Sequence, residues 1–164
     1  MSISILDSRI FKNTFGTQEV RDIFSDENYI KCLIEAEAAL ARAEAKTGVI
    51  PAEIGASLTD SLSRVQIEYG VLTNVVHRTT DLSSFDRLSR AADVVGYPVL
   101  PLIRQLGEQC PPEAARYIHW GATTQDIMDN AVILQIRTGI KLVRRQLLSL
   151  VSCLSDLAKK HRDT

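Results

Sequence analysis

The end of the chain carries an apolar pattern with helical spacing that is too long for a small compact fold. From Asp126 it runs almost unbroken to about Lys160, and Gly139 is its one weak position. The apolar members of the pattern are Ile127, Ala131, Leu134, Ile140, Val143, Leu147, Leu150, Val151, Leu154 and Leu157. Such a helix is about 50 Å long, which exceeds the diameter of a compact domain of this size. The sequence therefore predicts that this helix needs partners along its face, either from further chain after Thr164 or from self-association.

The rest of the chain also has helical patterns, so we expect an all-α fold. Ser25-Asp26-Glu27 is a good helix start, and Gly48 is the natural stop of that helix. Cys110-Pro111-Pro112 breaks the pattern and is the best domain boundary. Helices are expected over residues 19–23, 26–45, 52–65, 71–77, 81–95, 99–109 and 113–117.

The first 25 residues are expected to form an irregular lead-in. Phe11, Phe15 and Phe24 are its large apolar side chains. We expect all three to anchor the lead-in to the body of the protein.

A polar segment, residues 117–131, lies directly before and within the start of the long helix. Asp126 is the expected N-cap, because a short carboxylate accepts hydrogen bonds from the free N–H groups of a first turn. Thr123 and Thr124 then lie just ahead of a helix N-terminus, where an anion is favoured. A substrate carboxylate bound by two hydroxyls is one interpretation. The alternative is a plain capping segment beside a packed or solvated His119.

The segment His119-Trp120-Gly121-Ala122-Thr123-Thr124-Gln125-Asp126-Ile127-Met128-Asp129 resembles the first signature of the fumarase/aspartase superfamily. Members usually have serine where this chain has Thr124, which keeps the hydroxyl. The resemblance implies that Thr123 and Thr124 bind a substrate carboxylate. It also implies that His119 is an active-site residue that hydrogen-bonds substrate, although we do not assign it as the general acid. Gln125 is a candidate substrate contact, whereas Asp126 and Asp129 are expected to hold the loop and cap the helix.

The resemblance favours one branch of this superfamily, that of 3-carboxy-cis,cis-muconate cycloisomerase. Adenylosuccinate lyases tend to carry an Arg-Tyr pair near their start, where this chain has Phe15-Gly16. They also generally have a catalytic His-Asp pair where this chain has Tyr97-Pro98. Tyr97 is a candidate hydrogen-bond donor to substrate, and a packed tyrosine is the alternative. An adenylosuccinate lyase-like enzyme that releases fumarate remains the second interpretation.

The family's reaction is β-elimination next to a carboxylate, or the reverse addition, which closes a lactone in the cycloisomerases. The resemblance implies a small polycarboxylate substrate and no metal or organic cofactor. It also implies a homotetramer whose active sites are assembled from three subunits. Residues 1–111 would be an N-terminal helical domain, and residues 112–164 would hold the first long helix of a central helical bundle. The family's second and third signatures are absent from these 164 residues, so we expect this chain alone to be inactive. A non-catalytic helical interaction module is the alternative.

Composition narrows the classes of partner. Lys and Arg number 19 against 20 Asp and Glu, and aromatic residues are only 5%. Because nucleic acid and anionic membranes select basic surfaces, neither is expected as a partner. The three cysteines form no Cys-x-x-Cys pair, which argues against a zinc site. No apolar run approaches membrane-spanning length, and the N-terminus lacks the pattern of a signal peptide. We therefore expect a cytoplasmic protein.

Overall fold

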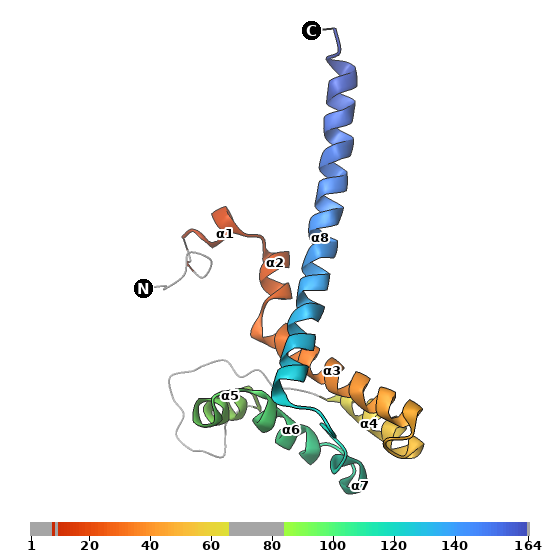
Figure 1. The fold of residues 1–164 in the computed structure, drawn as a ribbon. Coiled ribbons are helices and arrows are strands. Elements are labelled where there is room, and N and C mark those ends of the chain that lie inside the picture. The colour runs from red at the N-terminus through yellow and green to blue at the C-terminus, as the bar shows by residue number, and fades with distance from the viewer. Residues whose placement is uncertain (1–7, 9, 66–83, 164) are drawn as a thin grey trace. The chain divides into compact units, whose positions relative to one another are not determined.

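A computed structural model describes residues 8, 10–65 and 84–163 of the chain. Every regular element in these ranges is an α-helix, so the fold is all-α as expected (Figure 1). The expected helix over 71–77, and residues 81–83 of the one expected over 81–95, lie outside the described residues. The helices are α1 (Lys12–Phe15), α2 (Gln18–Ile23), α3 (Asp26–Thr47), α4 (Ala52–Arg64), α5 (Ser84–Val95), α6 (Val99–Glu108), α7 (Pro112–Ala115) and α8 (Thr124–Lys160).

The predicted start and stop of α3 are both confirmed. The Ser25 hydroxyl accepts a hydrogen bond from the Asn28 N–H at 3.2 Å and so caps the first turn. At the other end Gly48 has a φ of 76°, in the left-handed region that favours glycine. The Val49 N–H then donates back to the Glu44 carbonyl at 2.9 Å. This 6→1 bond is the Schellman pattern that satisfies carbonyls of the last helical turn.

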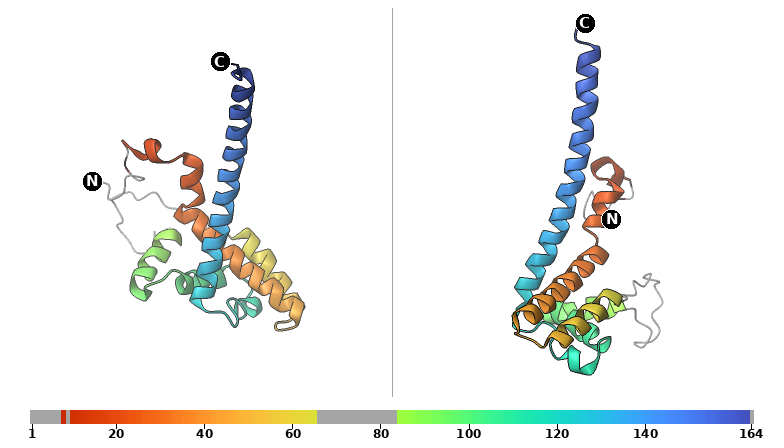
Figure 2. Two further views of the ribbon diagram at one scale, coloured as in Figure 1. Left: turned by 45° about the horizontal axis from the view of Figure 1, so that its top comes forward. Right: turned by 90° about the vertical axis from the view of Figure 1, so that its right-hand side faces the viewer.

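The described chain divides into two compact units, one of which is residues 30–131. In this unit α3 and α4 lie side by side as a hairpin (Figures 1 and 2). Gly55 permits their close approach, because a Cβ atom at this position would lie 2.3 Å from the Ala45 Cβ. Helix α4 also packs on α7, and α6 packs on α5 and α7. The largest fully buried apolar side chains are Leu33, Ile50, Leu58, Leu102, Leu106 and Val99.

The second unit consists of residues 1–29 and 132–164. Here the Gln135 side chain donates to the Ile23 carbonyl at 2.9 Å, and the Phe24 ring lies against Gly139 of α8. Phe11, Phe15 and Phe24 are each more than half exposed, so none of the three is a buried anchor, and Phe24 alone has the contact with Gly139. Phe11 is the N-cap of α1 and Phe15 is its last residue, and this single helical turn has no buried residue.

Helix α8 has 37 residues and a length of about 55 Å. Leu142 is its last buried residue within the described range. Beyond it, Val143, Leu147, Leu148, Leu150, Val151, Leu154 and Leu157 are all more than half exposed. The described chain therefore leaves this apolar stripe uncovered. No helix in the described ranges combines the length and apolarity needed to cross a membrane.

Candidate functional site

The loop between α7 and α8 contains two residues with a positive φ, on either side of Trp120. Tyr117 donates its N–H to the Ala114 carbonyl at 2.9 Å, which prolongs α7 by one turn. His119 then has a φ of 62° and Gly121 a φ of 69°. Glycine adopts this left-handed conformation freely, whereas for other residues it is uncommon and requires support from their surroundings. The loop therefore holds His119 in a backbone conformation that contacts outside the loop must stabilise.

The contact that holds His119 is made with a buried carboxylate on α3. The His119 Nδ1 atom lies 2.7 Å from Glu37 Oε1. The Glu37 side chain is only 1% exposed, while that of His119 is 21% exposed. Burial raises the pKa of Glu37 above its usual range, and the hydrogen bond with His119 opposes this effect. Its second oxygen, Oε2, is buried and has no partner among the described residues.

A second carboxylate, Glu44, lies two helical turns further along the same face of α3. Burial raises the pKa of Glu44 as well. A Cβ atom on Gly121 would lie 3.8 Å from Glu44 Oε1, so Glu44 approaches the same loop. Two carboxylates of α3 thus lie against the loop that carries His119.

The polar residues at the start of α8 are arranged differently from the sequence prediction. The helix begins at Thr124, which makes Thr123 the N-cap. The expectation that Asp126 is the N-cap is therefore wrong. Asp126 is the third helical residue, and its Oδ2 accepts a hydrogen bond from the Thr123 N–H at 2.9 Å. A carboxylate in this position reaches back to the N-cap N–H, as in a capping box.

Both threonine hydroxyls are available at this helix start. Thr123 is exposed and Thr124 is half-buried. Within the described ranges neither hydroxyl has a hydrogen-bond partner. The first turn of any helix also has N–H groups without intrahelical partners, and these favour an anion. The arrangement is chemically suited to bind a carboxylate.

The remaining predicted residues lie in two places. Gln125 donates its side-chain amide to Asp129 Oδ1 at 2.5 Å, so the two form a pair on the exposed side of α8. Tyr97 lies in the turn before α6 and is 37% exposed. Among the described residues no hydrogen bond or ring contact joins Tyr97 to the loop. The structure therefore brings His119 together with Glu37, whereas no such contact joins Tyr97 to either residue within the described ranges.

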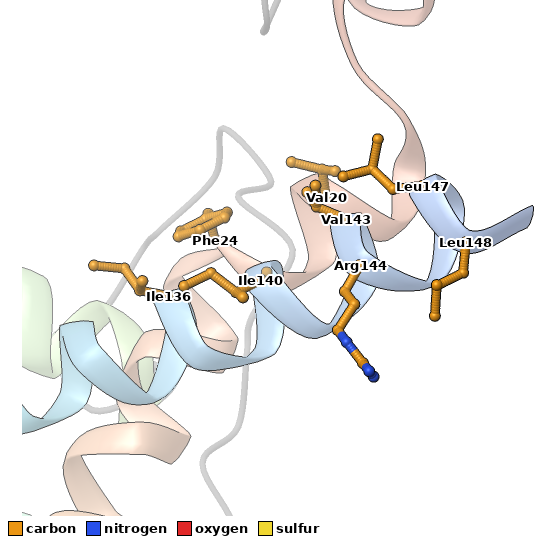
Figure 3. A pocket seen from close by; sticks show the side chains of 9 residues that line it. Val20, Phe24, Ile136, Ile140, Val143, Arg144, Leu147 and Leu148 are labelled. Atoms are coloured by element: carbon orange, nitrogen blue, oxygen red, sulfur yellow. The ribbon is translucent and has the colours of Figure 1, made fainter. Parts of the chain in front are cut away.

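A large apolar hollow lies elsewhere and includes none of these residues. It has a volume of about 480 Å³ and lies between α2 and α8. Figure 3 shows the side chains of Val20 and Phe24 facing those of Ile136, Ile140 and Val143. Arg144 is the one charged residue among the nine that line it. With so few polar groups this hollow is unsuited to a polycarboxylate. Among the described residues no group of three His, Cys, Asp or Glu could hold a metal ion.

Comparison with known proteins identifies the family. The sequence profile of a family described as "Lyase" matches residues 13–164. The chain belongs to this lyase family, the fumarase/aspartase superfamily. Lyases similar to it include the trans-aconitate decarboxylase 1 of Mycosarcoma maydis, 36% identical over 91% of this chain and 27% of that protein. The 3-carboxy-cis,cis-muconate cycloisomerase of Pseudomonas aeruginosa is 35% identical over 96% of this chain and 31% of that protein.

Solved structures of lyases share the fold. The fumarate lyase of Mesorhizobium sp. BNC1 is 40% identical, with a TM-score of 0.77 over 91% of this chain and 31% of that chain. The present chain thus spans about a third of the length of the relatives that it matches.

The sequence did not predict the contact between Glu37 and His119. In α3 the apolar positions recur every three or four residues, and Glu37 and Glu44 occupy two places in that stripe, seven residues apart. A carboxylate on the buried face of an alanine-rich helix needs a partner. That signal was present in the sequence, although the sequence does not name His119 as the partner.

Proposed function

We propose that the protein is a lyase or cycloisomerase that acts on a small polycarboxylate, in the manner of the 3-carboxy-cis,cis-muconate cycloisomerases. The reaction is β-elimination, or the reverse addition that closes a lactone. This chain contributes one wall of the active site, in which Thr123 and Thr124 bind a substrate carboxylate and His119 hydrogen-bonds substrate. Gln125 is a further substrate contact, and Tyr97 donates to substrate from the turn before α6. The proposed chemistry requires no metal or organic cofactor.

The observation that carries the proposal is the geometry at the start of α8. When a base removes a proton beside a carboxylate, negative charge spreads into that carboxylate. Fixed donors aimed at the developing charge lower the barrier. Thr123 and Thr124 offer two hydroxyls beside the positive end of a 37-residue helix. Asp126 fixes the Thr123 backbone through its 2.9 Å hydrogen bond, so the donors are held in place before substrate arrives.

The named substrates of two relatives support an unsaturated polycarboxylate. Both trans-aconitate and 3-carboxy-cis,cis-muconate have three carboxylates and at least one carbon–carbon double bond. A nucleotide substrate is less well supported, because Phe15 and Gly16 stand where adenylosuccinate lyases tend to carry an Arg-Tyr pair. The Phe15 ring is exposed, and neither residue offers a cation for a phosphate.

The test uses the protein at the length its own cells produce. Loss of the conjugated double bonds of 3-carboxy-cis,cis-muconate is followed by ultraviolet absorbance, with adenylosuccinate as the comparison substrate. A hydrogen bond to a charged group contributes about 1.5–3 kcal/mol. Thr123→Ala and Thr124→Ala should therefore each lower kcat/KM by roughly 10- to 100-fold. Thr138→Ala is the matched control, because this threonine is also on α8 and its hydroxyl donates only to the Leu134 carbonyl.

Each outcome separates the alternatives. Unchanged kinetics in the double variant Thr123→Ala/Thr124→Ala would remove the carboxylate site. Turnover of adenylosuccinate in place of the muconate would assign the protein to the adenylosuccinate lyase-like alternative. Binding of polycarboxylates without turnover of any would favour a non-catalytic helical module.

We also propose self-association through α8, as a homotetramer in the cytoplasm. The uncovered stripe beyond Leu142 supports this assembly, since burying a leucine side chain contributes about 1.5–3 kcal/mol. A long helix with an apolar face is stable in water when other helices cover that face. This chain alone is then expected to lack activity.

A further inference from the structure

We propose that Glu37 is a positioning residue for His119, whose Nδ1–H donates to the Glu37 carboxylate, so that Nε2 is the nitrogen presented to substrate. The inference rests on the proposed function, since it adds a residue to the same site. Glu37 is far from the loop in sequence, 82 residues before His119. Its role follows from the contact between α3 and the loop.

The distance and the burial together define the pair. An Nδ1–Oε1 separation of 2.7 Å is typical of a charge-assisted hydrogen bond. Imidazole is by nature a stronger base than a carboxylate, so the proton between them belongs to Nδ1. With Glu37 1% exposed, its Oε1 is shielded from bulk solvent. A ring held this way exchanges its second proton only at Nε2.

The backbone of the loop supports the same assignment. His119 is the one non-glycine residue with a positive φ among the described residues. A left-handed conformation is unfavourable for an L-residue other than glycine, so a contact outside the backbone must stabilise it. Glu37 is the hydrogen-bond partner of the ring. The pair therefore fixes the position of the ring as well as its tautomer.

The charges that face Glu37 are few. From the loop it meets His119, and on its own helix Glu44 is the other carboxylate that influences it. Oε2 of Glu37 lacks a partner within the described chain. His119 is thus the group that compensates the buried charge.

The direct test is the ¹⁵N spectrum of the His119 ring in the native-length protein labelled with ¹⁵N-histidine. The signals that disappear in His119→Asn assign the ring. In the unaltered protein the neutral ring should carry its proton on Nδ1. In Glu37→Gln the side-chain amide can donate to Nδ1 as well as accept from it, so the preference for the tautomer protonated at Nδ1 should be lost. Glu35→Gln is the matched control, because it removes an exposed carboxylate from the same helix, two positions before Glu37, and should leave the tautomer unchanged.

Kinetics provide the second readout. Groups that orient a metal-binding histidine typically contribute about 10- to 100-fold to function, and we take that range as a guide for a histidine that binds substrate. Glu37→Gln should lower kcat/KM by at least about tenfold, mainly through kcat, whereas Glu35→Gln should not. A neutral ring protonated at Nε2 in the unaltered protein would overturn the proposal, and that measurement does not depend on any variant at Glu37 folding. Equal kcat/KM in Glu37→Gln and the unaltered protein would also overturn it.

The two proposals fail separately. If no polycarboxylate is turned over but the ring carries its proton on Nδ1 and loses this preference in Glu37→Gln, the pair stands and the reaction assigned above is rejected. If turnover is found but the tautomer is the same with and without Glu37, the reaction stands and the positioning role is rejected.

Discussion

Alanine substituted for glycine should have opposite effects on stability at Gly55 and Gly139. Both residues lie inside helices, Gly55 in α4 and Gly139 in α8. In an open helix the change would stabilise by up to about 1 kcal/mol, because glycine has more backbone freedom to lose on folding. The surroundings of each new Cβ atom decide whether this gain survives.

At Gly55 the new Cβ would lie 2.3 Å from the Ala45 Cβ and 3.1 Å from the Ala41 carbonyl oxygen. The carbonyl oxygen is part of the backbone and an alanine Cβ has no rotamers, so neither atom can turn away. Only separation of α3 from α4 relieves the overlap. Overpacking of this kind costs about 1–3 kcal/mol. We expect a net loss of about 1–2 kcal/mol in the free energy of unfolding.

At Gly139 the new Cβ would lie 3.3 Å from the Phe24 ring. That ring is half exposed, so it can move by the few tenths of an ångström required. We expect the variant to be unchanged or to gain up to about 1 kcal/mol.

Urea titration followed by circular dichroism at 222 nm measures both variants against the unaltered protein. A Gly55→Ala variant as stable as the unaltered protein would refute the close packing of α3 on α4. Since α3 carries Glu37, that result would also weaken the geometry of the His119 pair.

Three further predictions concern the helix start, the buried carboxylate and the apolar stripe. Asp126→Ala should lower the free energy of unfolding by about 0.5–2 kcal/mol through loss of the bond to the Thr123 N–H, measured by urea titration. Because the pKa of Glu37 is raised in the folded state, its contribution to stability is complete below the ordinary glutamate pKa of about 4.3 and is lost as pH rises through the raised value. The urea midpoint of unfolding of the unaltered protein should therefore fall between pH 4 and 7 relative to the midpoint of Glu37→Gln at the same pH. Midpoints of the two proteins that change with pH in parallel would contradict this. Leu150→Glu should dissociate the assembly in sedimentation velocity, whereas Ser149→Glu on the same helix should not.

The sequence predicted the helices well because their signals are local. The apolar periodicity, Ser25 at one end of α3 and Gly48 at the other act within a few residues of where they appear. Asp126 was misplaced by three positions, and the single turn α1 falls in a segment that was expected to be irregular. Both an N-cap and an N3 carboxylate bind N–H groups of the first turn, and sequence spacing alone does not separate the two.

The site was predictable only in part, because its central contact is not local. The 117–131 segment is recognisable from its own residues, and the family match of the whole chain agrees with it. Its partner Glu37 lies on another helix, and only the folded chain brings the two together. The sequence did not identify Gly139 as the contact of Phe24, because that contact is also not local. Phe11 and Phe15 are exposed, since apolarity alone does not ensure burial.

The left-handed backbone at His119 sets two requirements against each other. Judged by conformation alone, this position would suit glycine or asparagine better, yet neither offers a ring that a carboxylate can orient. Because loss of His119 alone would leave the buried Glu37 carboxylate without its partner, variants selected only for thermal stability should lose this histidine together with Glu37, whereas variants selected for turnover should retain both. Position 119 is in that sense a point where stability and activity are traded against each other.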